Sequence, residues 1–380
     1  MKISKKRVVV LAILLLLVVS QIPFAYRRYT LRRLNAAIQQ LNFERTTYDR
    51  DGFSEHVGVV HVHSFLGGHS SGTFQEIISA AQANRLQFVI MTEHPEEHID
   101  TAAMTLSGML GGVLFINGSE LSAANGDRTL KLSEEISIAA YPEEFKDWAT
   151  PDLDGVEVYN VFTNARRVNP VVAFFDVVWS QRAYPELIFA HYFERPDESL
   201  KKWDQALAQR RLMAVGGNDA HSNIGLSLKD SSGKTLLGIQ LDPYETSFRL
   251  VRLHALIEKN RPLDPPSLLS AIQAGHCFIG FDFLGDSSGF LFEAENPGEK
   301  KIQGDEIALQ QGTRLRIRTP ISSRIVVLKD GAVFLDESGI NTKELAITER
   351  GVYRVEVYLP QLDPIVAQKP WIISNPIYVR

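Results

Sequence analysis

Residues 57–64 read VGVVHVHS, an apolar run that ends in two histidines separated by one residue. Runs of this length and composition are typical of strands that are buried on both faces of a parallel sheet. Four more apolar runs also end in a residue that can bind a metal ion. They lead to Thr92-Glu93-His94, Gly118-Ser119-Glu120, His191 and Gly217-Asn218-Asp219-Ala220-His221. Because the carboxyl ends of parallel strands meet at one mouth of a β/α barrel, we expect these side chains to gather there.

Strand-like and helix-like segments alternate from about residue 57 to residue 220. The seven strand candidates are residues 57–60, 86–91, 113–116, 136–140, 155–159, 187–190 and 212–215. The helix candidates between them are residues 73–84, 101–110, 165–181 and 198–210, and Thr73 and Glu76 are spaced to form a capping box at the first. This order predicts an α/β fold built as a seven-stranded β/α (TIM-like) barrel, with a doubly wound open sheet as the alternative.

The pattern changes after His221. Residues 244–259 and 266–275 are predicted to be helices and residues 277–283 a strand, all of them on the side of the barrel. Short alternating segments follow at 315–318, 323–329, 345–347, 351–358 and 371–379, as is typical of a small β-sandwich. The predicted domains are therefore a metallohydrolase barrel over residues 53–290 and a β-sandwich over residues 291–380.

The amino-terminal segment is predicted to lie outside the globular fold. Residues 8–19 are continuously apolar, and the apolar character continues to Tyr26. No cleavage signal follows, so we interpret residues 1–26 as an uncleaved signal anchor that crosses the membrane once. Residues 27–52 are predicted to form a juxtamembrane helix and a linker. Four basic residues stand on each side of the anchor, and the free amino terminus favours an extracytoplasmic (periplasmic or extracellular) catalytic domain.

The composition narrows the function classes. Of 380 residues, 44% are hydrophobic and 22% are charged, which is typical of a folded globular protein. The net charge of -5 provides no basic excess for a nucleic-acid backbone, so there is no strong nucleic-acid signal. Cys277 is the single cysteine, which excludes an intrachain disulfide and a structural zinc site built on several cysteines.

Histidines concentrate at the predicted strand ends. Six of the ten follow strand candidates, namely those at positions 61, 63, 69, 94, 191 and 221. His61 and His63 are expected on one face of their strand, because side chains alternate with a period of two. Glu120 and Asp219 add carboxylates, and a carboxylate can bridge two cations, which a neutral histidine cannot do. Such a set suits the site of a zinc or manganese hydrolase.

The motifs HVHS at 61–64, TEH at 92–94, GSE at 118–120 and GNDAH at 217–221 resemble, in this order, those of the polymerase-and-histidinol-phosphatase (PHP) superfamily. The resemblance covers roughly residues 53–285. It implies a distorted seven-stranded barrel that holds two or three divalent ions (zinc, manganese or iron) and hydrolyses phosphate esters. The sequence SNPIY at 374–378 resembles membrane-associated or exported members with a C-terminal β domain.

At matching positions the resemblance implies specific ligands. His61, His63, Glu120 and Asp219 resemble one metal site, with Glu120 bridging to a second ion. His69, His94 and His221 resemble the ligands of a further site.

One position departs from the family pattern. Members often carry Ala-His-Pro at the end of the fourth strand, and this chain has Ala140-Tyr141-Pro142. The following strand, GVEVYN at 155–160, matches. We expect His191 to replace the missing ligand, although Tyr141 could also be normal for a subfamily. Glu93 stands where the family often has an aspartate, which is a mild change.

The preferred function is a metal-dependent phosphoesterase that acts on a small phosphorylated ester. With metal-binding side chains expected at the strand ends, a metal-bound hydroxide is the expected nucleophile. His221 or His191 could carry the proton. Cations that could bind the phosphate are Arg128, Arg166, Arg167 and Arg195, and Arg195 is the preferred catalytic candidate.

Two alternatives stay open. The same metal centre could hydrolyse a carboxylic ester, an amide or a carbamate. The chain could also be a non-catalytic, membrane-anchored metal-binding protein, which the altered Tyr141 favours and the retained histidines and carboxylates disfavour.

Overall fold

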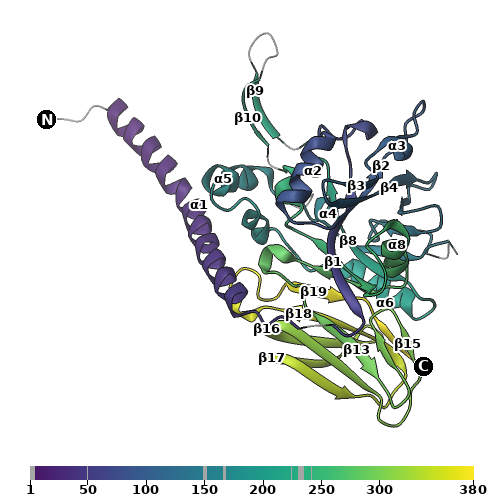
Figure 1. Cartoon of the computed structure of the whole chain (residues 1–380). Coiled ribbons are helices and arrows are strands. Elements are labelled where there is room, and N and C mark those ends of the chain that lie inside the picture. Colours follow the sequence, from purple (N-terminus) through teal and green to yellow (C-terminus); the bar gives the residue numbers. More distant parts are fainter. Residues whose placement is uncertain are drawn as a thin grey trace.

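A long N-terminal helix leads into a barrel, and a β-rich lobe lies beneath the barrel (Figure 1). The computed structural model describes residues 5–48, 50–148, 152–165, 168–223, 225–229, 235–240 and 242–380. Arg166 and Arg167, two of the predicted phosphate-binding cations, lie outside the described residues.

Seven strands close the barrel. In order around it they are β1 (Phe53–Val62), β2 (Phe88–Glu93), β4 (Val113–Ser122), β5 (Arg128–Lys131), β6 (Ser137–Ala140), β7 (Gly155–Asn160) and β8 (Met213–Ala220), and β8 pairs with β1. The barrel is therefore closed, as predicted, and is not an open sheet. β5 runs antiparallel to both of its neighbours, so the barrel is mixed, and the regular β/α order of a TIM-like barrel is not observed.

Three predicted elements were wrong. Residues 101–110 are not one helix, because α3 (Thr101–Met104) is followed by the strand β3 (Gly108–Leu110). Residues 187–190 form part of a 3-10 helix, η2 (Leu187–His191). The seventh barrel strand is instead β5, which lies between β4 and β6. Residues 244–259 are not one helix, because α7 (Tyr244–Ser247) is followed by the strand β11 (Arg252–Glu258). Residues 187–190 and most of β11 are largely buried, and periodicity alone does not separate helix from strand in short buried runs.

Helices cover the barrel. They are α2 (Phe74–Ala83), α3 (Thr101–Met104), α4 (Val161–Ala165), α5 (Pro170–Ser180), α6 (Asp197–Leu207) and α8 (Pro265–Gln273), with the short turn η1 (Phe65–Gly67). The predicted capping box of α2 is confirmed, because the Glu76 backbone N–H donates to Thr73 Oγ1 and the Thr73 backbone N–H donates to the Glu76 carboxylate. Outside the barrel, β3 (Gly108–Leu110) pairs with β4, and β9 (Gly225–Lys229) pairs with β10 (Thr235–Gln240).

The sheet continues from the barrel into the C-terminal lobe. β11 pairs antiparallel with the first half of β1 and with β12 (Cys277–Gly280), which in turn pairs with β19 (Pro370–Ser374). The other elements of the lobe are η3 (Asp282–Leu284), β13 (Leu291–Glu295), β14 (Lys300–Ile302), β15 (Glu306–Ile307), β16 (Arg314–Lys329), β17 (Ala332–Ala346), β18 (Gly351–Tyr358), η4 (Pro360–Leu362) and β20 (Ile377–Val379). One buried apolar cluster extends through both parts, so the lobe supports the barrel directly.

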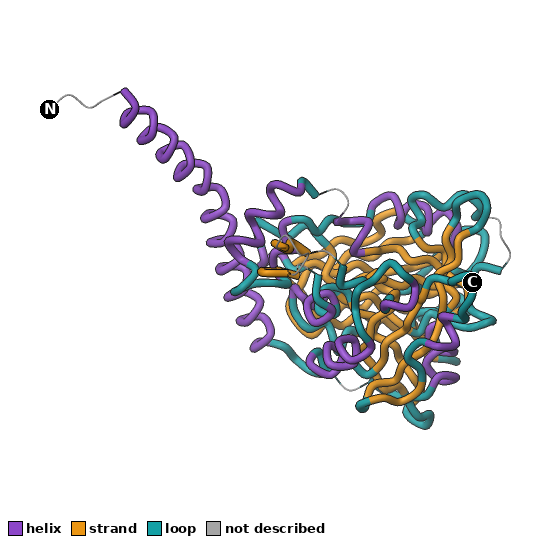
Figure 2. The backbone as a smooth tube through the Cα atoms, turned by 90° about the horizontal axis from the view of Figure 1, so that it is seen from above, coloured by secondary structure: helices purple, strands orange, loops and turns teal. Residues whose placement is uncertain are grey.

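The helix α1 (Lys5–Glu44) has two parts with opposite surroundings. Its first part is apolar and unburied, and Figure 2 shows it extending away from the body. Among the described helices, α1 alone is long and apolar enough to cross a membrane. Its second part packs into the core through Leu31, Leu34, Ile38 and Leu41, all of which are buried. The predicted juxtamembrane helix is thus a continuation of α1 that belongs to the folded body.

A buried charge cluster joins β1, β11 and η3. His254 Nδ1 lies 2.7 Å from Glu55 Oε1, and His254 Nε2 lies 3.3 Å from Asp282 Oδ2. The Ser287 hydroxyl donates to Asp282 Oδ1 and lies 3.1 Å from His254 Nε2, so it accepts from a doubly protonated imidazole. Burial alone would lower the pKa of His254, but Asp282 and Glu55 outweigh it and raise this pKa to about 9. The protonated form of His254 is therefore a cation that bonds two carboxylates.

This cluster predicts a pH dependence of stability. A histidine whose pKa is raised on folding contributes stability that is complete below its unfolded pKa and is lost as the pH rises through its folded pKa. The free energy of unfolding should therefore fall between pH 6.5 and about pH 9, by up to roughly 3 kcal/mol. Chemical denaturation of the full chain in detergent over this range measures the slope. In His254→Gln the slope should flatten, and an unchanged slope would contradict the assignment.

Candidate metal centre

The site lies at the carboxyl ends of β1, β4 and β8, where the backbone departs from regular geometry. Register shifts interrupt the pairing of β1 with β2 and with β8 between Val60 and Val62. His61 and Asp219 have positive φ angles of 68° and 47°, and Tyr141 at the end of β6 has 49°. Such angles are uncommon for residues other than glycine, and they cluster at functional sites, as bulges do. The bulge means that His61 and His63 reach one site without regular strand alternation.

Four buried side chains converge here: His61, His63, Glu120 and Asp219. The His61 Nε2 atom lies 3.1 Å from Glu120 Oε2 and 3.5 Å from Asp219 Oδ1. The His63 Nε2 atom lies 3.4 Å and 3.6 Å from the same two oxygens. A tetrahedral ion with ligands at about 2.1 Å places those ligands about 3.4 Å apart. The spacing of the four atoms therefore fits a single ion at their centre.

Unpartnered atoms support the same fit. Both ring nitrogens of His63 and the Oδ1 atom of Asp219 are buried without a hydrogen-bond partner. Leaving such groups unpaired is costly, so they are rarely orphaned without a reason. Burial lowers the pKa of His63 to about 3, so its imidazole is neutral and its contact with Glu120 is not an ion pair. A neutral imidazole with a free nitrogen is the form that binds a metal ion.

Glu157 orients His61 from the side opposite to the cluster. The His61 Nδ1 atom lies 2.6 Å from Glu157 Oε1, so Nε2 is the nitrogen that faces Glu120 and Asp219. Burial would lower the pKa of His61, but Glu157 and Asp219 outweigh it and raise this pKa well above its usual value. Gly217 makes room for this contact, because a Cβ atom there would lie 1.7 Å from Glu157 Oε1. A carboxylate behind a histidine is the usual support of a metal ligand.

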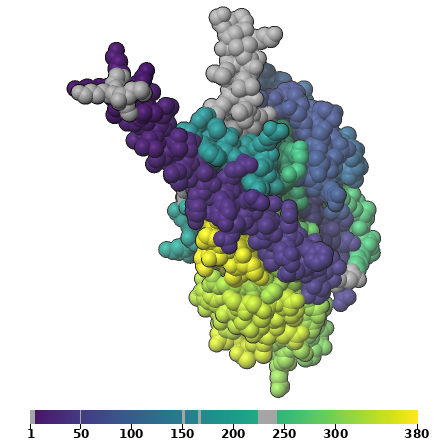
Figure 3. All heavy atoms as spheres, turned by 90° about the vertical axis from the view of Figure 1, so that its left-hand side faces the viewer, coloured from purple at the N-terminus to yellow at the C-terminus, as the bar shows by residue number. Residues whose placement is uncertain are grey.

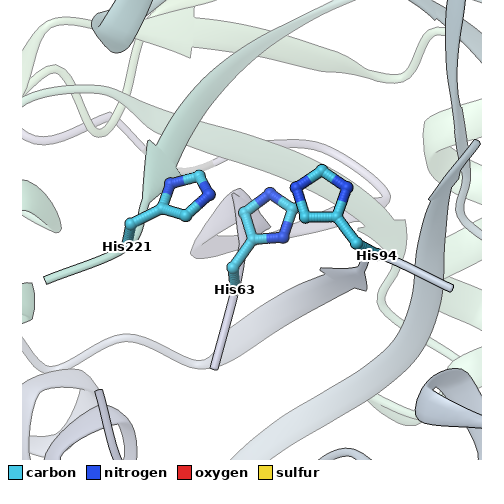
Figure 4. A group of neighbouring side chains, drawn as sticks. All are labelled: His63, His94 and His221. Carbon is cyan, nitrogen blue, oxygen red and sulfur yellow. The ribbon is translucent and has the colours of Figure 1, made fainter. Parts of the chain in front are cut away.

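A second group of three histidines adjoins the first. The His63 ring lies between the rings of His94 and His221, with ring centroids 4.5 Å and 4.2 Å apart (Figure 4). These three residues offer ligand atoms close enough for one ion. Glu120 links the two groups, since its Oε2 atom also lies 3.6 Å from His94 Nε2. His221 Nδ1 lies 3.3 Å from Asp219 Oδ1.

His69 lies at the edge of this arrangement. Its ring meets that of His94 edge-on at a centroid distance of 4.9 Å, but it belongs to neither group of candidate ligands among the described residues. The Asn223 side chain donates to the backbone carbonyl of His69 at 2.5 Å and fixes this loop near the site. His69 therefore lies next to His94 but is not one of the side chains that gather around the carboxylates.

Tyr141 and Asn160 complete the surroundings of Asp219. The Tyr141 hydroxyl donates to Asp219 Oδ2 at 2.6 Å, and the Asn160 amide donates to the same oxygen at 3.3 Å. Burial and the charge of Asp219 raise the pKa of Tyr141, which therefore stays a neutral donor. Tyr141 leaves Oδ1 of Asp219 free to face the two histidines. Tyr141 thus orients the carboxylate of Asp219, one of the candidate ligands.

Two of the four arginines that the sequence suggested, Arg128 and Arg195, lie in the described residues, and their surroundings differ. Arg128 Nη1 lies 2.9 Å from Glu120 Oε1, and its side chain is partly exposed beside the site. Arg195 instead bonds Glu356 in the C-terminal lobe, as well as Asp197. Its charge is neutralised by these two carboxylates. Arg128 is therefore the described cation that is best placed to meet a charged ligand at the cluster.

His191 lies in a different environment from the other candidates. It ends η2 rather than a strand, and it belongs to neither group of candidate ligands. Burial and the charge of Arg27 lower its pKa to about 4, so it is neutral, and its Nε2 atom has no hydrogen-bond partner. Arg27 and Asp176, which bond each other, influence its charge. The ligand role expected for His191 stays a prediction that these contacts do not support.

Glu157, Asn160 and Gly217 were missed as site residues. The signal was present in GVEVYN at 155–160, because Glu157 and Asn160 lie three residues apart near a strand end. Glu93, which the sequence marked as a departure from the family, accepts from the Ser64 backbone and from the Thr105 hydroxyl. Glu93 thus holds the loop that follows β1 in place, and it does not face the candidate ligands.

The roles of Tyr141 and His191 can be separated by metal analysis. Tyr141→Phe removes the hydroxyl that orients Asp219, and loss of such a supporting hydrogen bond typically weakens metal affinity by about 10- to 100-fold. His191→Ala should leave both the metal content and the affinity unchanged. Competition with a chelator, followed by element analysis of both variants, measures these effects. A lower metal content in His191→Ala would restore the ligand role of His191.

The fold and the cluster together define a class: a closed barrel with histidines and carboxylates that converge at the carboxyl ends of its strands and could hold a metal ion. A scan of family models and a search of curated proteins find no match. Among solved structures, the chain is similar to a two-domain protein from Bacteroides vulgatus ATCC 8482, described as containing a predicted PHP-like metal-dependent phosphoesterase. That match has 14% identity and a TM-score of 0.40, and covers 87% of this chain and 98% of the other.

A second similar structure is PsfC from Pseudomonas syringae PB-5123, with 13% identity and a TM-score of 0.36, covering 58% of this chain and 90% of the other.

Proposed function

We propose that this chain is a metal-dependent phosphoesterase of the PHP type that works with two or three divalent ions. The observation that supports it most directly is the spacing of His61, His63, Glu120 and Asp219, whose four ligand atoms lie 3.1 to 3.6 Å apart across the measured contacts. A mixed set of imidazoles and carboxylates suits zinc, manganese or iron.

Each group of side chains has a role in this proposal. His61, His63, Glu120 and Asp219 would hold one ion. His94 and His221, with Glu120 as the bridge and His69 nearby, would hold a second. When bound, the ions would supply Lewis acidity toward the phosphate and toward an attacking water. Glu157 and Tyr141 hold His61 and Asp219 in the orientations that leave their ligand atoms free.

Arg128 would bind the phosphate, because it is partly exposed and in contact with Glu120. This choice replaces Arg195, whose guanidinium is held by Glu356. If His221 does not bind the second ion, it is the candidate proton carrier, since it lines the cavity next to Asp219 whereas His191 is absent from that lining. A phosphate group would thus meet metal ions on one side and a guanidinium on the other.

We further propose that α1 anchors the chain in a membrane and that the barrel lies on the extracytoplasmic side. The apolar first part of α1 is unburied, and the basic residues on its two sides nearly balance. The free amino terminus favours the cytoplasm for the chain start.

Metal content and substrate choice test the proposal together. The full chain, purified in detergent, should carry two or three equivalents of divalent metal and should hydrolyse a phosphomonoester or a phosphodiester. His63→Ala should lose metal and activity, whereas His56→Ala, a matched change on the same strand, should keep both. Turnover of carboxyl esters alone would favour the alternative hydrolase, and a folded chain that binds metal without turnover would favour a binding protein.

A further inference from the structure

An apolar cavity of about 190 Å³ opens beside the metal centre. Asp219 and His221 line one end of it, so the cavity reaches the candidate ligands directly. The other lining residues are of two kinds. Apolar side chains come from α4, α5, the end of the segment before η2, η2 itself and the segment before β11, and they include Phe162, Val177, Pro185, Ile188, Phe189 and Leu250. Polar side chains include Gln181, Asn218, Asn223, Asp242, Thr246 and Ser247. A phosphate ester of a small polar alcohol would leave this apolar surface without a partner. The lining instead fits an alkyl chain attached to the group that is hydrolysed.

The helix α5 carries a second apolar surface on its outer side. Val171, Phe174 and Val178 are 63%, 42% and 59% exposed, and we call these three residues the α5 stripe. They are spaced three and four residues apart, so they lie on one face of the helix. Three large apolar side chains on one exposed face of one helix are more than the single scattered residues that are normal on a protein surface.

The α5 stripe lies next to the cavity on the same helix. Successive residues of an α-helix are turned by about 100°. This rotation puts the cavity-lining residues Val177 and Gln181 beside Phe174 on the helix surface. The apolar lining of the cavity is therefore continued by the apolar stripe, with no charged residue of α5 between them.

Side-chain contacts between α5 and α1 determine what surrounds the α5 stripe. Phe24 stacks on Phe175 with ring centroids 4.8 Å apart, and the Trp179 indole donates to the Gln21 side chain at 3.0 Å. Arg27 bonds Asp176. These contacts hold α5 at residues 21–28 of α1, where the apolar part gives way to aromatic and basic residues, as at a membrane–water boundary. Figure 3 shows the purple atoms of α1 against the teal surface of this part of the chain.

We infer that the substrate is a membrane amphiphile: a phosphate ester of a long-chain alcohol, drawn from the bilayer along the α5 stripe into the cavity. This inference rests on the proposed function. Water adds to phosphorus, the bond from phosphorus to the oxygen of the alcohol breaks, and a proton passes to that oxygen. The charged phosphate lies at the metal centre and Arg128, and the alkyl chain occupies the cavity lined by α5 and η2. The α5 stripe dips into the boundary region of the bilayer.

A chain-length comparison tests the substrate class. The full chain is reconstituted in phosphatidylcholine vesicles and given butyl phosphate or dodecyl phosphate. Each buried methylene contributes about a fourfold gain. If the small cavity buries two or three more methylenes of dodecyl phosphate than of butyl phosphate, kcat/KM should be about 16- to 64-fold higher for dodecyl phosphate. Gln181→Trp, which fills the cavity from its edge, should bring the ratio of the two kcat/KM values toward one. Equal kcat/KM values in the wild type would overturn the inference and leave the phosphoesterase standing.

A pair of surface variants tests the α5 stripe. The double change Phe174→Glu and Val178→Glu should lower the rate on dodecyl phosphate in vesicles about tenfold and leave that on butyl phosphate unchanged. The matched control is Val333→Glu and Phe334→Glu on β17, where the two residues are 65% and 44% exposed, and it should behave as wild type. If both double variants behave alike, α5 does not contact the bilayer and the inference fails.

Fluorescence tests the bilayer contact without relying on activity. Phe174→Trp should be quenched in vesicles whose acyl chains carry bromine, and Phe334→Trp should not. Absence of quenching at position 174 would mean that something other than lipid covers the stripe, and would overturn the inference. If the metal-loaded chain hydrolyses neither phosphate ester and no phosphodiester, the proposed function itself fails, and the substrate class falls with it. These outcomes separate the two claims.

Discussion

Asp219→Ala should remove at least one equivalent of bound metal and lower the turnover of a phosphate ester on the order of 10³-fold or more. Asp219 Oδ1 is buried, has no hydrogen-bond partner and lies 3.5 Å and 3.6 Å from the Nε2 atoms of His61 and His63. Alanine leaves the ion with three ligands. It also leaves the Tyr141 hydroxyl without its acceptor. Element analysis of the purified variant and a phosphatase assay measure the two losses.

Two further variants locate the cause of the Asp219→Ala effect. Asp219→Asn keeps an oxygen for the Tyr141 hydroxyl but removes the negative charge, so a large loss in this variant too assigns the effect to the charge that faces the ion. Asp336→Ala removes a carboxylate that pairs with Arg324 in the C-terminal lobe, and it should change neither measurement. Full metal content together with full turnover in Asp219→Ala would refute the placement of this residue at the ion.

The histidines at the strand ends could be predicted because each barrel strand is recognisable in the sequence from its own run of apolar side chains. Val59, Val60 and Val62 are buried on both faces of β1, so the run is continuously apolar and its end is marked by the first polar residue. The same reasoning located β2, β4 and β8. Since parallel strands share a direction, their ends meet, and the convergence of residues far apart in sequence follows from the architecture.

Other elements could not be read in this way. β5 is four residues long and only Leu130 is fully buried in it, so it offers no apolar run. β11 is buried along most of its length between β1 and β12, so its polarity does not alternate and its spacing also allows a helix. η2 reads as a strand because Leu187, Ile188 and Ala190 are buried in a short segment. In all three segments tertiary packing determines the conformation.

The supporting residues of the site were the hardest to predict. Glu157 is buried in a strand, where a carboxylate has no local sign of its partner, and its contact with His61 spans 96 positions in sequence. Gly217 is needed because a side chain there would collide with Glu157. Only the folded barrel reveals this requirement. The candidate ligands can therefore be recognised in the sequence. The residues that orient them can be found only from the folded structure, because they are close in space and not in sequence.

Glu120→Ala should remove all the bound divalent metal, a larger loss than Asp219→Ala causes. Glu120 Oε2 lies 3.1, 3.4 and 3.6 Å from the Nε2 atoms of the histidines at positions 61, 63 and 94, so one carboxylate serves both groups of ligands. Turnover should fall on the order of 10³-fold or more. Glu134→Ala, which changes an exposed carboxylate in the loop after β5, should keep metal and activity. Element analysis and circular dichroism of both variants separate loss of metal from loss of fold. One equivalent of metal retained by folded Glu120→Ala would show that the two groups bind independently and would refute the bridge.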